Sequence, residues 1–263
     1  YHSSEGQNET AFVEQELCRF RESLVDSVAA EQVAAVIMEP VQGEGGFVPV
    51  PKAYLQGLRR ICDETGILLI LDEVQSGFCR TGGWSAFEHY GVVPDMSTWA
   101  KSMGGGLPIG AVIGKAEIMD AARLGTIGGT YGGNPVACAA ALASIKLMGE
   151  LKLGTRATVI GNRVVECFRK LQRKHPEWIG DVRGLGAMVA IEFVVKRNPH
   201  DPATELTAEI LKGCSDRQLL ILGAGIYSNV LRFLAPLVIT DEQLERGLTI
   251  LSEEVASAIE RRS

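Results

Sequence analysis

The stretch Gly66-Ile-Leu-Leu-Ile-Leu-Asp-Glu-Val-Gln75 decides the fold of this chain, because an apolar run within it ends abruptly in a carboxylate. Residues 67–71 have the length and branched side chains of a strand that is buried on both faces. A second apolar segment ends in the lysine of Trp99-Ala-Lys101. Ligands of open α/β sheets bind outside the carboxyl ends of the strands. We therefore expect Asp72 and Lys101 to project into one crevice.

Strand-like and helix-like segments alternate on both sides of this stretch. Strands are expected at 33–38, 67–71, 96–100 and 109–113, and helices from residue 10, at 51–65 and at about 136–148. This alternation favours a mainly parallel sheet covered on both faces. A boundary is expected near 149–154. Beyond it the sequence predicts a strand at 187–194, a helix at 204–217, two strands within 219–237, and a final helix starting with a capping box at Thr240.

The fold class is therefore α/β, with a large domain over residues 1–150 and a smaller α+β domain over residues 151–263. The chain has 263 residues, of which 46% are hydrophobic, so a disordered protein is excluded. A net charge of −6 with no basic stripe argues against a nucleic-acid partner. The four histidines lack metal-ligand spacing, and no apolar run approaches a membrane span. The six scattered cysteines indicate reduced thiols, so we expect a cytoplasmic protein without a metal or a membrane partner.

A carboxylate and an amine in one crevice suit pyridoxal phosphate. A lysine forms the Schiff base of this cofactor, and an acidic group keeps its pyridinium nitrogen protonated. The alternative is a structural salt bridge between Asp72 and Lys101, which an arbitrary pair of this kind usually forms.

Further motifs around this pair favour the cofactor. They are Glu39-Pro-Val-Gln-Gly-Glu-Gly-Gly46, Leu71-Asp-Glu-Val-Gln-Ser-Gly77, Arg80-Thr-Gly82, Ala100-Lys-Ser102 and Gly128-Gly-Thr-Tyr-Gly-Gly-Asn-Pro135. In this order they resemble the class III aminotransferases, which are pyridoxal-phosphate enzymes of fold type I, the aspartate-aminotransferase fold. Within that class, Gly180-Asp-Val-Arg-Gly-Leu-Gly-Ala-Met188 and Asn229-Val-Leu-Arg-Phe-Leu-Ala-Pro-Leu237 are most similar to the bacterial 4-aminobutyrate aminotransferases.

The resemblance implies a role for each residue near the cofactor ring. Lys101 would hold the aldehyde and later move a proton between substrate and cofactor carbons. Asp72 would hold the ring nitrogen, Val74 would pack on one ring face, and Gln75 would contact the phenolic oxygen. Thr130 would reach the phosphate in the partner subunit, which implies a homodimer with shared sites.

Glu44 and Arg232 are the expected substrate-binding pair. Arginine binds a carboxylate with two parallel hydrogen bonds. 4-Aminobutyrate has no carboxylate on its reacting carbon, whereas glutamate has one. By resemblance, Glu44 neutralises Arg232 for the first substrate and releases it for glutamate or 2-oxoglutarate. The alternative is a permanent ion pair. Glu39 and Arg183 are expected to be structural.

The implied reaction converts 4-aminobutyrate and 2-oxoglutarate into succinate semialdehyde and L-glutamate. The same chemistry on 5-aminovalerate, ornithine or acetylornithine is an alternative, as is a decarboxylase, racemase or aminomutase on this scaffold. The chain begins with Tyr1 and lacks the phosphate loop and ring-stacking aromatic that precede these motifs in the family. We therefore expect a fragment or a processed product. An inactive remnant or an interaction subunit is the non-enzymatic alternative.

Overall fold

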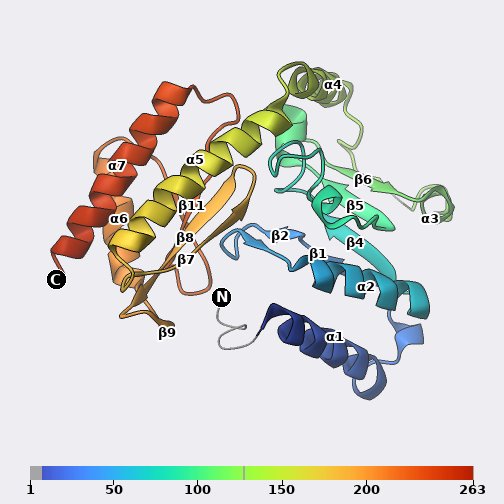
Figure 1. Cartoon of the computed structure of the whole chain (residues 1–263). Helices are drawn as coiled ribbons and strands as arrows, with labels where there is room; N and C mark the ends of the chain where they lie inside the picture. Colours follow the sequence, from blue (N-terminus) through green and yellow to red (C-terminus); the bar gives the residue numbers. More distant parts are fainter. Residues whose placement is uncertain (1–7, 127, 263) are drawn as a thin grey trace.

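The computed structural model describes residues 8–126 and 128–262. Two larger sheets organise them (Figure 1): a four-stranded sheet within residues 35–114 and a five-stranded sheet within residues 179–233. Helices α4 (Pro135–Glu150) and α5 (Leu153–Lys174) connect the two sheets. This is the predicted α/β architecture. The domain division at residue 150 stays a prediction, since one buried cluster contains both Trp99 of the first sheet and Ile160 of α5.

The first sheet has the strand order β1-β4-β5-β6. Strands β1 (Ala35–Met38), β4 (Leu68–Asp72) and β5 (Met96–Trp99) pair in parallel, and β6 (Ala111–Gly114) is antiparallel to β5. Helix α1 (Glu9–Asp26) precedes the sheet, and α2 (Lys52–Thr65) packs Leu55 and Leu58 into one cluster with Leu69 and Leu71 of β4. Helix α2 ends at Gly66, whose φ of 75° lies in the left-handed region that glycine favours.

Only one face of β4 is fully buried, so the prediction of burial on both faces is wrong. Leu69 and Leu71 are 0% exposed, whereas Leu68 and Ile70 are half-buried, and Ile37 of β1 is 61% exposed. Successive strand residues point to opposite faces. Helix α2 covers one face, and the described residues cover the other only in part. Asp72 lies on this second, more accessible face.

The second sheet has the order β10-β11-β8-β7, with β9 paired to β8. All its pairs are antiparallel. Its strands are β7 (Ile179–Leu185), β8 (Met188–Val195), β9 (Asn198–Pro202), β10 (Leu222–Ala224) and β11 (Val230–Phe233). Helices α5, α6 (Thr204–Asp216) and α7 (Asp241–Glu260) lie along it (Figure 1), and α7 begins at the predicted Thr240 capping box.

Strands β7 and β9 escape the sequence prediction because neither has an apolar alternation. Strand β7 reads Ile-Gly-Asp-Val-Arg-Gly-Leu, and its polar residues are held by cross-strand partners on β8 rather than by intrinsic propensity. The short hairpin of β2 (Val41–Gln42) and β3 (Val48–Pro49) is also missed by the sequence pattern, which predicts a loop there. The remaining short elements are η1 (Ala30–Gln32), η2 (Ala86–Tyr90), η3 (Lys101–Gly104) and α3 (Ala116–Met119).

The β2–β3 hairpin joins the two sheets. It starts beyond the carboxyl end of β1, and its residue Phe47 is 0% exposed in a cluster with Met188, Ala190 and Val230 of the second sheet. Residues 43–47, between the two hairpin strands, are called the 43–47 loop below. This loop places its glutamate, Glu44, between the carboxyl edge of the first sheet and one face of the second.

Candidate active site

Asp72 and Lys101 follow neighbouring parallel strands at the same edge of the first sheet. Asp72 is the last residue of β4 and pairs with Thr98 of β5. Lys101 comes two residues after the end of β5 and starts η3. Since paired strands lie about 4.8 Å apart, the chain places both residues at one edge, as the strand pattern predicts.

The backbone of Lys101 is strained. Its φ is 50°, in the left-handed region that residues with a side chain rarely adopt, and the preceding Ala100 is extended. Such conformations cost about 1–3 kcal/mol and concentrate at functional sites. The side chain of Lys101 is exposed, which leaves its amine accessible.

The turn after β4 fixes Asp72, Val74 and Gln75. Asp72 Oδ1 accepts a hydrogen bond from Val74 N at 2.9 Å, which closes a local Asx turn. The intervening Glu73 points away into the core, where it is 0% exposed. Its carboxylate accepts hydrogen bonds from Ser76 Oγ at 2.6 Å and Phe87 N at 3.0 Å, and its burial raises its pKa. Glu73 thus holds the turn to η2.

Glu44 and Arg232 form a bidentate ion pair across the two sheets. Arg232 donates from Nη1 to Oε1 at 2.7 Å and from Nη2 to Oε2 at 3.1 Å. The Arg232 side chain is 6% exposed and that of Glu44 is 80% exposed. Arg232 also lies 5.5 Å from the ring centroid of Phe47, a cation–π contact. A buried cation is therefore neutralised by a carboxylate that is free to move into solvent.

Glu44 is the point where the predicted residues meet. The hydrogen bond from Arg232 lowers the pKa of Glu44, and a hydrogen bond from Gln75 and the charge of Lys101 lower it further. Gln75 and Lys101 come from the edge of the first sheet, and Arg232 from β11. The structure thus brings these three residues together around the carboxylate of Glu44.

Thr130 lies in a different environment. It is exposed in the segment 128–134 that leads into α4, where Asn134 caps the helix by accepting from Val136 N at 2.9 Å. Phe47, in contrast, is a site residue that the sequence reasoning missed. A single aromatic residue directly after Gly-Glu-Gly-Gly is the signal that could have identified it, since the glycines let the chain turn inward there.

Within the described residues, no group of three or more His, Cys, Asp or Glu side chains could hold a metal ion. None of the described helices is long and apolar enough to cross a membrane.

Comparisons with known proteins identify the family of this chain. The sequence model of the class III aminotransferase family matches residues 1–255. A 5-aminovalerate aminotransferase of Pseudomonas aeruginosa is 53% identical over 85% of this chain and 52% of the relative. A 4-aminobutyrate aminotransferase of Escherichia coli is 49% identical over 87% of this chain and 53% of the relative. The chain spans about half the length of the curated relatives it matches.

Solved structures give the same result for the fold. A taurine:2-oxoglutarate aminotransferase from Bifidobacterium kashiwanohense, in complex with PLP and glutamate, superposes with a TM-score of 0.90 at 28% identity. The match covers 97% of this chain and 59% of that one. The ornithine aminotransferase of Toxoplasma gondii gives a TM-score of 0.83 at 33% identity, over 93% of this chain and 55% of its own. By its sequence, its fold and the order of its motifs, this chain belongs to the class III aminotransferases.

Proposed function

We propose that this chain supplies much of the active site of a pyridoxal-phosphate-dependent ω-aminotransferase. The reaction converts 4-aminobutyrate and 2-oxoglutarate into succinate semialdehyde and L-glutamate. The observation that carries the proposal is the Glu44–Arg232 pair, whose carboxylate also interacts with Gln75 and Lys101. Support comes from the family, from the 4-aminobutyrate aminotransferase of Escherichia coli, and from the solved relative in complex with PLP and glutamate.

The residues at the sheet edge fit the cofactor. Gln75 directs its amide toward Glu44, and its Oε1 is buried with no hydrogen-bond partner among the described residues. Buried polar atoms normally have a partner, so an unpaired one at this edge suits a ligand with a polar ring substituent. Asp72 and Lys101 add the carboxylate and amine that the cofactor requires.

Each residue then has a distinct task. When bound, pyridoxal phosphate supplies an electron sink for the carbon that loses a proton. Lys101 would hold the cofactor aldehyde, and its amine would move the proton between substrate and cofactor carbons. Asp72 would keep a proton on the ring nitrogen through a charged hydrogen bond. Val74 would pack on the ring, Gln75 would contact its phenolic oxygen, and Thr130 would bind the phosphate of the cofactor in the partner subunit.

Glu44 and Arg232 let one site accept two kinds of substrate. With 4-aminobutyrate bound, Glu44 stays on Arg232 and cancels its buried charge. With glutamate or 2-oxoglutarate bound, Glu44 moves away and Arg232 binds the α-carboxylate. The exposure of Glu44 favours this exchange over a permanent pair, because its carboxylate is already largely hydrated and leaves at low cost.

The test is a single-turnover assay of both half-reactions in a complete enzyme that contains these residues. Arg232→Ala should slow the 2-oxoglutarate half-reaction by about 10–100-fold, since a charged hydrogen bond contributes about 1.5–3 kcal/mol. The 4-aminobutyrate half-reaction should change much less. Arg246→Ala, on the exposed surface of α7, is the control. Equal losses in the two half-reactions would contradict the exchange.

Lys101 is tested by reduction with borohydride after loading with the cofactor. The wild type should absorb visible light and retain the cofactor covalently, and Lys101→Ala should lose both properties. Lys152→Ala is the matched control, since Lys152 is exposed and has a φ of 51°. A colourless wild-type protein that takes up no cofactor would favour an inactive remnant or an interaction subunit.

5-Aminovalerate is the second candidate substrate, because a 5-aminovalerate aminotransferase is 53% identical to this chain. Ornithine and acetylornithine remain further alternatives within the class. Like 4-aminobutyrate, these three donors have an amine on a carbon without a carboxylate, so the Glu44–Arg232 pair does not distinguish among the four. A profile of amino donors with detection of each semialdehyde separates them.

A homodimer is part of the proposal. Large apolar side chains are exposed on both sides of Thr130 in the sequence: Leu124 is 104% exposed, Tyr131 85%, Val136 66% and Leu142 72%. Exposed apolar surface is typical of interaction sites, which supports a partner subunit here. Sedimentation of the complete enzyme tests the prediction. The cytoplasmic location expected from the cysteines also stays a prediction.

A further inference from the structure

The second sheet holds the backbone of the 43–47 loop at three carbonyl oxygens. The three hydrogen bonds run from Arg232 Nη1 to Gly43 O at 3.2 Å, from Gly225 N to Glu44 O at 3.1 Å, and from Arg183 Nε to Gly46 O at 2.9 Å. Arg232 Nη1 also belongs to the Glu44–Arg232 ion pair. The bonds from Gly225 and Arg183 involve neither side chain of that pair, so they hold the loop backbone independently of it.

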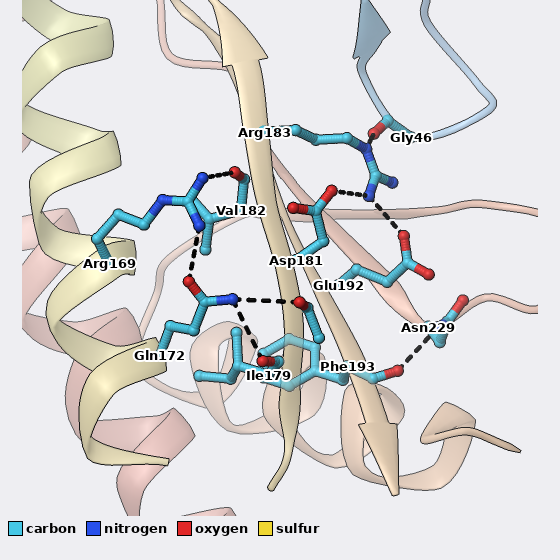
Figure 2. Close-up of polar contacts among 11 residues, drawn as sticks. Gly46, Arg169, Gln172, Ile179, Asp181, Val182, Arg183, Glu192, Phe193 and Asn229 are labelled. Carbon is cyan, nitrogen blue, oxygen red and sulfur yellow. Dashed lines mark hydrogen bonds and ion pairs between the residues drawn. The ribbon is translucent and has the colours of Figure 1, made fainter. Parts of the chain in front are cut away.

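Arg183 is held in place by two carboxylates (Figure 2). Its Nη1 donates to Asp181 Oδ2 at 3.1 Å and to Glu192 Oε2 at 2.5 Å. The side chains of Arg183 and Glu192 are 12% and 6% exposed. The guanidinium is planar, so fixing Nη1 between two carboxylates also fixes the direction of Nε, which reaches Gly46. A Cβ atom at Gly46 would lie 3.0 Å from Arg183 Nη2, so the contact is close.

The sheet register places Arg183 and Arg232 in one row. Arg183 of β7 pairs with Ala190 of β8, and Ala190 pairs with Arg232 of β11. The two arginines are thus separated by two strand spacings, or about 10 Å, on the same face. The small Ala190 between them leaves room for Phe47, which packs in its cluster. One arginine therefore holds each end of the 43–47 loop.

We propose that Arg183 is a positioning residue that fixes the 43–47 loop so that Glu44 pairs with Arg232, or leaves it, by rotation of its side chain alone. This inference rests on the proposed roles of Glu44 and Arg232. It gives Arg183 a task beyond a local structural one: it keeps the loop backbone stationary while the carboxylate exchanges partners.

Arg183→Lys is the direct test. A lysine keeps the positive charge between Asp181 and Glu192, but its single ammonium group has no second nitrogen directed at Gly46. Arg169→Lys is the matched control. Arg169 also donates to a carbonyl of β7, from Nη2 to Val182 O at 2.6 Å, and it binds Gln172 instead of the loop (Figure 2). The double variant Arg183→Gln with Glu192→Gln removes both charges together, and serves if the single variant fails to fold.

Two measurements on the cofactor-free chain decide the question. The first is the rate of hydrogen exchange with solvent at the Gly46 and Gly225 amides, which donate to Gly43 O and Glu44 O. This rate should be at least about tenfold faster in Arg183→Lys, because the variant loses one charged hydrogen bond to the loop. The second is the pKa of Glu44 by NMR, which should rise toward its usual value because a mobile loop pairs Glu44 less well with Arg232. Both should be unchanged in Arg169→Lys.

Unchanged exchange in Arg183→Lys would overturn the proposal, and so would faster exchange with an unchanged Glu44 pKa. A change in both measurements supports it. These results are separable from the proposed function: if Arg232→Ala slows both half-reactions equally, the substrate exchange fails, while the amide exchange and the Glu44 pKa still report whether Arg183 positions the loop.

Discussion

Replacing Asp95 with asparagine should destabilise β4, the strand that ends in Asp72. Asp95 Oδ2 accepts hydrogen bonds from Leu69 N of β4 and Arg59 Nη1 of α2, both at 2.7 Å, and Oδ1 accepts from Lys115 Nζ at 2.6 Å. The Asp95 side chain is 5% exposed. One buried carboxylate thus links the strand of Asp72 to a helix and to the segment after β6.

The pKa of Asp95 gives the magnitude. Burial alone would raise this pKa, but the Leu69 amide, Lys115 and Arg59 outweigh burial and lower it from 3.8 to about 2. A difference of this size corresponds to about 2 kcal/mol of stability at pH 7. Since the folded-state pKa is the lower one, the contribution is complete above pH 3.8 and is lost as the pH falls toward 2. It should drop to roughly half by pH 3.

The assay is urea unfolding and thermal unfolding of the wild type and Asp95→Asn at pH 7, 5 and 3. We expect a loss of about 2 kcal/mol at pH 7 and a fall in Tm of roughly 4–8 °C, with a smaller difference at pH 3. Asp63→Asn is the control, because Asp63 also binds Arg59, at 2.8 Å, but is 62% exposed. It should cost less than about 1 kcal/mol. A loss that is equal at pH 7 and pH 3 would refute the electrostatic argument.

Three further predictions use the same chain. Gly161→Ala should cost at least about 3 kcal/mol in unfolding experiments, because the new Cβ would lie 1.8 Å from Gly186 O. The control Gly149→Ala should be neutral or stabilising, since the nearest atom to its Cβ is 3.9 Å away. Similar losses of stability in the two variants would contradict the close packing at Gly161. The pKa of Glu44, measured by NMR, should lie below its usual value of 4.5, so its pair with Arg232 should be lost only as the pH falls through the lowered pKa. Arg232→Ala should restore the usual pKa. The same pKa in both proteins would exclude the pair in solution. Thr240→Ala should cost about 1 kcal/mol in thermal unfolding by removing the N-cap of α7, and no loss would mean that the cap is dispensable.

The sequence by itself determined the features that depend on local chemistry. The apolar run before Asp72 predicts β4, Gly66 predicts the end of α2, and Thr240 with its Thr-x-x-Gln spacing predicts the start of α7. Each signal lies within a few residues of the element it sets, because strand burial and helix caps are short-range effects. The position of Lys101 after β5 follows in the same way.

Only the tertiary structure decided which distant residues meet. Arg183 donates to Gly46 over a separation of 137 residues, a contact that the sequence does not predict. Arg232 binds Glu44 over 188 residues, and this pair is expected only from the resemblance to the family, not from local chemistry. Such contacts depend on the register of β7, β8 and β11, and the polar sequence of β7 does not even predict a strand. Pairing with β8 makes residues 179–185 a strand, and the register places Arg183 and Arg232 in the row that holds the 43–47 loop. The physical reason is that the partners of a strand side chain are fixed by the adjacent strands rather than by its neighbours in the sequence.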